Sequence, residues 1–118
     1  MLLVDDDIDL LLTYEALLQA HDYQTSTAEN GAQALELLKS REVDAILCDL
    51  DMPELSGDLV YEEVGRTQPE ALKRFIFVTG NVDNPIYEEF LKRTKPTVLS
   101  KPISSDRLLQ HLRALTGA

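Results

Sequence analysis

The sequence is poor in cysteine and in basic residues, and it has no long apolar run. Its one cysteine, Cys48, excludes an internal disulfide and fits a reducing cytoplasm, which is the expected location. No apolar run approaches the ~20 residues that a membrane span needs, so no membrane is expected. Lysine and arginine number 11 against 21 acidic residues, a formal net charge of -10. So acidic a surface repels nucleic acid and suits cations and basic partner surfaces.

The length and hydrophobic content indicate one folded unit. The chain has 118 residues, of which 44% are hydrophobic, enough for one core but not for two. We therefore expect a single domain over residues 1–118. Because Met1 lies almost directly on the first apolar run, we also expect this domain to be part of a longer protein.

Short apolar segments alternate with segments of helical periodicity. The apolar segments predict strands at residues 2–4, 23–27, 43–47, 75–78 and 97–99. Helical spacing covers residues 8–20, 32–39, 59–66, 85–92 and 104–115. Residues suited to helix N-caps are Asp7, Asn30, and Ser104 or Ser105. Short apolar strands separated by helices predict an α/β fold, an open doubly wound (βα)5 parallel sheet with helices on both faces.

Ligands of such sheets bind beyond the carboxyl ends of the strands, so the residues there are the candidates for function. The first predicted strand runs into Asp5-Asp6-Asp7, and the third, in "DAILCDLDMP", ends at Asp49, with Asp51 two residues farther on. Adjacent carboxylates repel one another, and a divalent cation satisfies several of them at once. We expect Asp6, Asp49 and the backbone carbonyl of Asp51 to bind Mg²⁺, with Asp5 acting through water. Asp7 suits the helix cap better.

The fourth and fifth predicted strands end in a hydroxyl, Thr79, and an amine, Lys101. A carboxylate such as Asp49 can attack phosphorus and form an aspartyl phosphate. Phosphoryl transfer then requires that the negative charge on three equatorial phosphoryl oxygens be compensated. One oxygen would be bound by Mg²⁺, another by the Lys101 ammonium, and the third by the Thr79 hydroxyl together with backbone N–H groups.

Together these residues resemble the receiver domains of two-component response regulators. The resemblance covers nearly the whole chain and rests on Asp5-Asp6, Asp49 followed by "LDMPELSG", Thr79, and Lys101-Pro102. It implies a flavodoxin-like sheet of strand order 2-1-3-4-5. It also implies that Asp49 accepts a phosphoryl group from a phosphohistidine of a histidine kinase or histidine phosphotransfer domain. The phosphorylated domain would then switch an output domain or a downstream partner.

By the same resemblance, Asp5 and Asp6 hold Mg²⁺, with Mn²⁺ as a substitute, and Thr79 and Lys101 sense the phosphate. Self-phosphorylation and dephosphorylation are expected, without turnover of a separate substrate. The bond before Pro102 is often cis in this family. The stretch "RFIFVTGN…FLKRT" is similar to the receivers of hybrid histidine kinases. The resemblance leaves open whether the domain forms a homodimer.

Three positions bear on how such a receiver would signal. The family usually has an aromatic residue three positions before Lys101, and that residue swings inward when Thr79 engages phosphate. This chain has Val98, which cannot make the same rotation. The fourth helix is therefore expected to signal differently, or not to form the output surface. Asp51 and Asn81 lie where the family tunes the phosphate lifetime.

Two other functions are open on the sequence alone. Asp49-Leu50-Asp51 resembles the DxD motif of haloacid-dehalogenase-like phosphatases, in which the first Asp is the nucleophile and the second a general acid. That motif normally follows the first strand and does not continue with Met52-Pro53. The other alternative is a degenerate receiver that acts only as a binding module, although all the key residues are present.

Overall fold

The computed structural model describes residues 1–117, in which strands and helices alternate along the chain. The strands are β1 (Leu2–Val4), β2 (Ser26–Ala28), β3 (Ile46–Asp49), β4 (Phe75–Thr79) and β5 (Thr97–Ser100). The α-helices are α1 (Ile8–Ala20), α2 (Gly31–Ser40), α3 (Gly57–Thr67), α4 (Glu88–Thr94) and α5 (Ser105–Thr116). Two 3₁₀ helices lie next to β4 in the sequence: η1 (Pro69–Arg74) precedes it, and η2 (Pro85–Tyr87) follows it.

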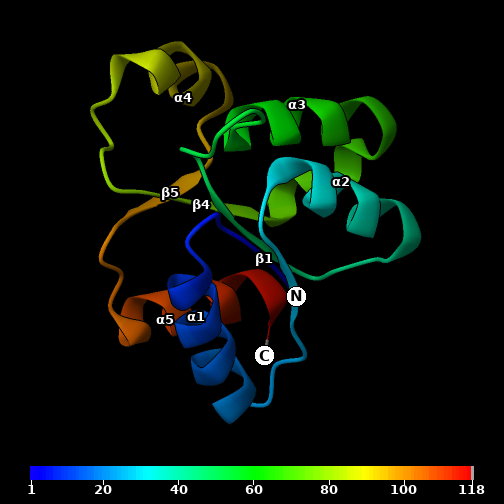
Figure 1. Cartoon of the computed structure of the whole chain (residues 1–118), viewed down its shortest axis with the longest axis vertical. Coiled ribbons are helices and arrows are strands. Elements are labelled where there is room, and N and C mark those ends of the chain that lie inside the picture. The colour runs from blue at the N-terminus through cyan, green and yellow to red at the C-terminus, as the bar shows by residue number, and fades with distance from the viewer. Residues whose placement is uncertain (118) are drawn as a thin grey trace.

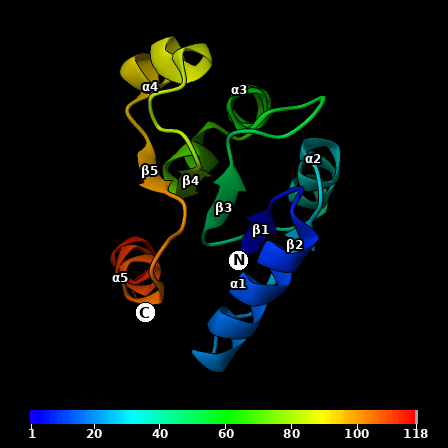
Figure 2. The ribbon, with the colours of Figure 1, turned by 60° about the vertical axis from the view of Figure 1, so that its left-hand side comes forward.

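The five strands form one parallel sheet of order β2-β1-β3-β4-β5, which confirms the predicted fold. In its register Val4 pairs with Cys48, and Asp49 pairs with Val78. Helices α1 and α5 cover one face, while α2 and α3 cover the other (Figures 1 and 2). No helix within residues 1–117 combines the length and the apolar character that crossing a membrane requires.

Each face of the sheet has its own core. The α1–α5 face is mainly aliphatic and includes Leu11, Leu18, Leu108 and Leu112. The opposite face contains an aromatic group of Tyr61, Phe75, Phe77 and Phe90, with neighbouring ring centroids 5.2 to 5.8 Å apart. The three inner strands, β1, β3 and β4, are buried along their whole length, as expected for a parallel sheet between helices.

The predicted helix starts are confirmed by side-chain caps. The Asp7 carboxylate accepts a hydrogen bond from the Leu10 N–H at 3.2 Å. The Asn30 side chain accepts from the Gln33 N–H at 2.8 Å. Ser104, rather than Ser105, caps α5. These caps satisfy N–H groups that have no partner within the helix.

Some predicted boundaries were wrong. β2 and β3 begin three residues later than the apolar pattern indicates, whereas β3 ends at Asp49 as expected. The ladder of backbone hydrogen bonds sets a strand's length, and Asp49 still pairs with β4 despite its charge. The predicted helix at residues 85–92 starts as η2 and becomes α4 only at Glu88.

Candidate functional site

Three polar side chains are buried at the carboxyl edge of the sheet. Asp5 follows β1, Asp49 ends β3 and Thr79 ends β4, and their exposed fractions are 1%, 4% and 2%. Burying a charged or hydroxyl group is costly unless it finds a partner. The strand ends predicted from the sequence therefore lie together. The groups that bind these three buried side chains define the site.

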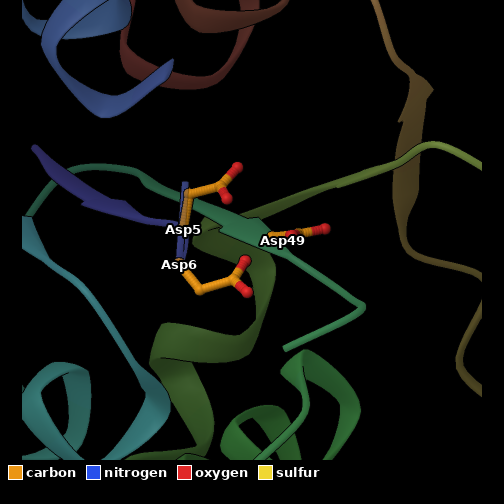
Figure 3. A group of neighbouring side chains, drawn as sticks. All are labelled: Asp5, Asp6 and Asp49. Carbon is orange, nitrogen blue, oxygen red and sulfur yellow. The ribbon is translucent and has the colours of Figure 1, made fainter. Parts of the chain in front are cut away.

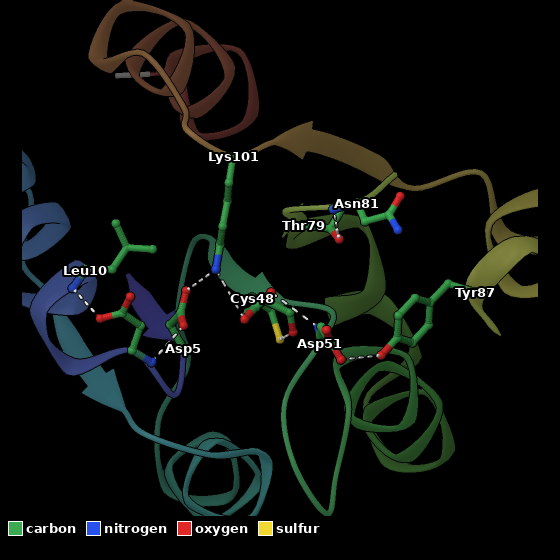
Figure 4. A network of polar contacts seen from close by, with 10 residues as sticks. Asp5, Leu10, Cys48, Asp51, Thr79, Asn81, Tyr87 and Lys101 are labelled. Carbon is green, nitrogen blue, oxygen red and sulfur yellow. Dashed lines mark hydrogen bonds and ion pairs between the residues drawn. The ribbon is translucent and has the colours of Figure 1, made fainter. Parts of the chain in front are cut away.

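Lys101 supplies the positive charge for the two buried carboxylates. Its ammonium nitrogen lies 3.0 Å from Asp5 Oδ2 (Figure 4) and 3.3 Å from Asp49 Oδ2. Its backbone N–H donates to the Thr79 carbonyl at 2.8 Å, and the Lys101–Pro102 peptide bond is cis, as expected. Burial alone would lower the pKa of Lys101, but the hydrogen bond to Asp5 and the charges of Asp49 and Asp5 together raise it. The amine therefore stays charged.

The pKa of Asp49 is raised to about 6. Burial is the largest cause, and the charge of Asp5 adds to it. Lys101 and the Asp51 N–H, which lies 3.3 Å from Asp49 Oδ1, act in the opposite direction without cancelling the effect. The ionised Asp49 carboxylate is thus incompletely compensated and would gain from another cation.

Asp5, Asp6 and Asp49 place carboxylate oxygens within 4.8 Å of one another (Figure 3). Asp6 is exposed, so the cluster opens to solvent on that side. Its donors are all hard oxygen atoms, and Mg²⁺ binds such ligands while keeping several waters. The residues present therefore fit a magnesium ion.

Gly57 fixes the loop that follows β3. A Cβ atom at this position would clash with the backbone carbonyl oxygen of Asp49. The Gly57 N–H donates to the Leu50 carbonyl at 2.9 Å, so α3 starts directly against the end of β3. The sequence contains this glycine in "LDMPELSG", but its close approach to Asp49 was not predicted.

The family model for the response regulator receiver domain matches residues 1–113. The chain belongs to that family. A curated relative, the transcriptional regulatory protein ZraR of Klebsiella oxytoca, is 33% identical over 92% of this chain and 24% of its own length. The chain thus spans about a quarter of the length of that relative.

Sensor kinases are also among the receiver's relatives. The sensor kinase CckA of Brucella abortus is 31% identical over 92% of this chain and 11% of its own length. The receiver domain of the sensor histidine kinase PA1611 from Pseudomonas aeruginosa, solved with a magnesium ion in its active-site cleft, is 25% identical. Its TM-score is 0.86, with 99% of this chain and 96% of that chain covered.

The family match favours a receiver over the phosphatase alternative. In this receiver Asp49 ends the third strand, whereas the phosphatase motif normally follows the first.

Cys48, beside Asp49, is fully buried, and burial raises the pKa of its thiol, so it packs as an apolar side chain.

The β4 side of the receiver's site is held by hydroxyl groups. The Asn81 N–H donates to the Thr79 hydroxyl at 3.1 Å (Figure 4). Farther out, the Tyr87 hydroxyl donates to Asp51 Oδ1 at 3.3 Å. Tyr87 is buried, and burial together with the Asp51 charge raises its pKa to about 12, so the phenol keeps its proton.

Tyr87 was not predicted as a site residue. It lies 36 residues from Asp51 in the sequence and at the end of η2, where no short motif marks it. A buried tyrosine hydroxyl usually has a polar partner, but the sequence does not identify that partner. Only the packing of η2 against the site reveals it.

Proposed function

We propose that Asp49 of this receiver accepts a phosphoryl group from a phosphohistidine of a histidine kinase or histidine phosphotransfer domain. An Asp49 oxygen forms the new bond to phosphorus as the bond from phosphorus to the imidazole nitrogen breaks. The imidazole keeps the electron pair and takes up a proton. The observation that carries the proposal is the buried Asp49 carboxylate among Asp5, Asp6 and Lys101.

Asp5, Asp6, Asp49 and the backbone carbonyl of Asp51 would hold Mg²⁺ in this reaction. When bound, the ion neutralises charge on the phosphoryl oxygens. The magnesium ion in the receiver of PA1611 supports this assignment. Mn²⁺ accepts the same oxygen ligands and would substitute.

Lys101 and Thr79 would contact the phosphoryl group from the other two strands. The Lys101 ammonium, already 3.3 Å from Asp49 Oδ2, is placed to balance one phosphoryl oxygen. The Thr79 hydroxyl currently accepts a bond from Asn81 and has its own proton to donate. Both contacts strengthen as negative charge arrives, which is the requirement for sensing phosphate.

Phosphorylation would change the population of two conformations and so control an output domain or a downstream partner. ZraR and CckA show that receivers of this sequence type occur in a transcriptional regulator and in a sensor kinase. We propose the phosphoryl transfer to Asp49, which would be common to both kinds of protein. It would take place in the cytoplasm, with the receiver as one unit of a longer protein. A homodimer of phosphorylated receivers would be one form of output.

Intact mass after incubation with acetyl phosphate tests the proposal. Wild type should gain one phosphate with Mg²⁺ and none in excess chelator. Asp49→Asn should gain none, while Asp44→Asn, exposed before the start of β3, should behave as wild type. No gain in folded wild type, with acetyl phosphate or a phosphohistidine donor, would contradict the proposal and favour a binding module. Continuous phosphate release from a phosphomonoester would favour the phosphatase.

A further inference from the structure

Helix α4 lies at one end of the sheet, beside β5 (Figure 1). It has seven residues, and side chains from other elements hold it. Arg93 forms an exposed ion pair with Glu62 on α3, and the Phe90 ring lies 5.3 Å from that of Tyr61. At its start, the Tyr87 hydroxyl reaches Asp51. Of these links, the one through Tyr87 leads to the phosphoacceptor site.

The link through Tyr87 consists of two consecutive hydrogen bonds. The Asp51 N–H donates to Asp49 Oδ1 at 3.3 Å, and the Asp51 carboxylate accepts from Tyr87 at 3.3 Å. Figure 4 shows Tyr87 pointing at Asp51 from the α4 side, opposite Lys101. Glu88, the next residue, is the first of α4. A displacement of the Tyr87 ring would therefore move the start of the helix.

Val98 leaves the position of the usual aromatic switch without a ring or a hydroxyl. Its side chain packs against the same core cluster that contains Tyr87 and Phe90. Within this core cluster Tyr87 has the features that Val98 lacks. Its ring is buried, and its hydroxyl donates to Asp51 Oδ1 at 3.3 Å.

We propose that Tyr87, acting through the Asp51 side chain, carries the phosphorylation state of Asp49 to α4 in place of a β5 aromatic. This inference rests on the proposed phosphorylation of Asp49. A phosphoryl group converts the Asp49 carboxylate into an acyl phosphate, a mixed anhydride, and brings negative charge close to the Asp51 carboxylate. A carboxylate crowded by negative charge holds a donor hydroxyl more tightly. Tyr87 is therefore a positioning residue that draws the start of α4 toward the site.

Hydrogen exchange of the whole chain, read by mass spectrometry with and without acetyl phosphate and Mg²⁺, tests the inference. In wild type, exchange of peptides covering residues 85–94 should slow on phosphorylation. Tyr87→Phe should take up phosphate at Asp49 and lose this slowing. Tyr61→Phe removes a hydroxyl from the same aromatic face and should keep it. The readout is the difference between the two phosphorylation states, which a general loosening of α4 by the substitution would not remove.

A double-mutant comparison checks that Tyr87 acts through Asp51. In an Asp51→Ala background, normalised to the extent of labelling, Tyr87→Phe should cause no further loss of the α4 response. Slowing that persists in labelled Tyr87→Phe would overturn the inference and leave the proposed function intact. Wild-type exchange that does not slow despite full labelling would also overturn the inference and leave the proposed function intact. Absence of labelling in wild type would instead overturn the proposed function, and the inference with it.

Discussion

The two sides of the site are held together by different forces. On the β1–β3 side, two buried carboxylates share one ammonium at 3.0 and 3.3 Å. On the β4–α4 side, the Thr79 and Tyr87 hydroxyls form hydrogen bonds of 3.1 and 3.3 Å, and the partner, Asn81 or Asp51, is exposed. The first side responds to any change of charge. The second is held by fewer and weaker contacts and can follow that change by moving.

The largest expected effect is on the charged side. Lys101→Met leaves the carboxylates of Asp5 and Asp49 facing each other without a cation. Removing one partner of a buried ion pair typically costs about 3–5 kcal/mol, so the free energy of unfolding at pH 7 without Mg²⁺ should fall by about that much. Urea denaturation measures it. Lys39→Met, at an exposed ion pair on α2, is the control, and an equal loss in both variants would show that Lys101 does not balance the site.

Asp49→Asn should stabilise the protein at neutral pH. The folded pKa of Asp49, about 6, lies above the unfolded value of roughly 3.9, so the folded state binds more protons between these values. Its contribution to stability is therefore lost as the pH rises from about 4 to 6. Well above pH 6, Asp49→Asn should exceed wild type by roughly 3 kcal/mol in chelator, and the difference should vanish below about pH 4. A gain that is independent of pH would contradict the raised pKa.

Mg²⁺ should raise the melting temperature of wild type at pH 7.5, because the ion binds only the folded carboxylate cluster. At ten times the dissociation constant, the stabilisation should be about 1.4 kcal/mol. Thermal unfolding monitored by circular dichroism measures the shift. Asp6→Asn, at the exposed ligand, should remove most of it, whereas Asp9→Asn on α1 should keep it. An identical shift in both variants would place the ion elsewhere.

The smallest effect is expected on the hydroxyl side. Thr79→Val keeps the shape of the side chain but removes the acceptor of the Asn81 N–H. The loss of one such bond should lower the free energy of unfolding by about 1 kcal/mol. Thr97→Val, at the exposed start of β5, is the control in the same denaturation assay. A loss comparable to that of Lys101→Met would mean that the two sides do not differ in the way described.

Most of the fold and the charged side of the site could be predicted from the sequence. Parallel strands bring their carboxyl ends to one edge, so Asp5, Asp49, Thr79 and Lys101 had to meet once the alternation of strands and helices was recognised. Each of these residues is adjacent to the apolar run that positions it, and short sequence patterns capture such relations well.

The remaining features depend on contacts between distant segments. The Tyr87–Asp51 bond joins η2 to the loop after β3, and the approach of Gly57 to the Asp49 carbonyl depends on how α3 packs. The start of β3 was missed because backbone pairing, rather than hydrophobicity, sets it. These features emerge only when the layers are assembled, and the Tyr87–Asp51 bond lies on the side that we expect to move.

The position of the phosphoryl group in the labelled protein decides whether Asp49 is the acceptor. Wild type labelled with acetyl phosphate and Mg²⁺ would be digested at low temperature, and the peptides compared before and after neutral hydroxylamine. An acyl phosphate is an activated carboxyl group that hydroxylamine cleaves, whereas serine and threonine phosphates survive. We expect one phosphate on the peptide that contains Asp49, and we expect hydroxylamine to remove it. A phosphate on any other peptide, or one that resists hydroxylamine, would contradict it.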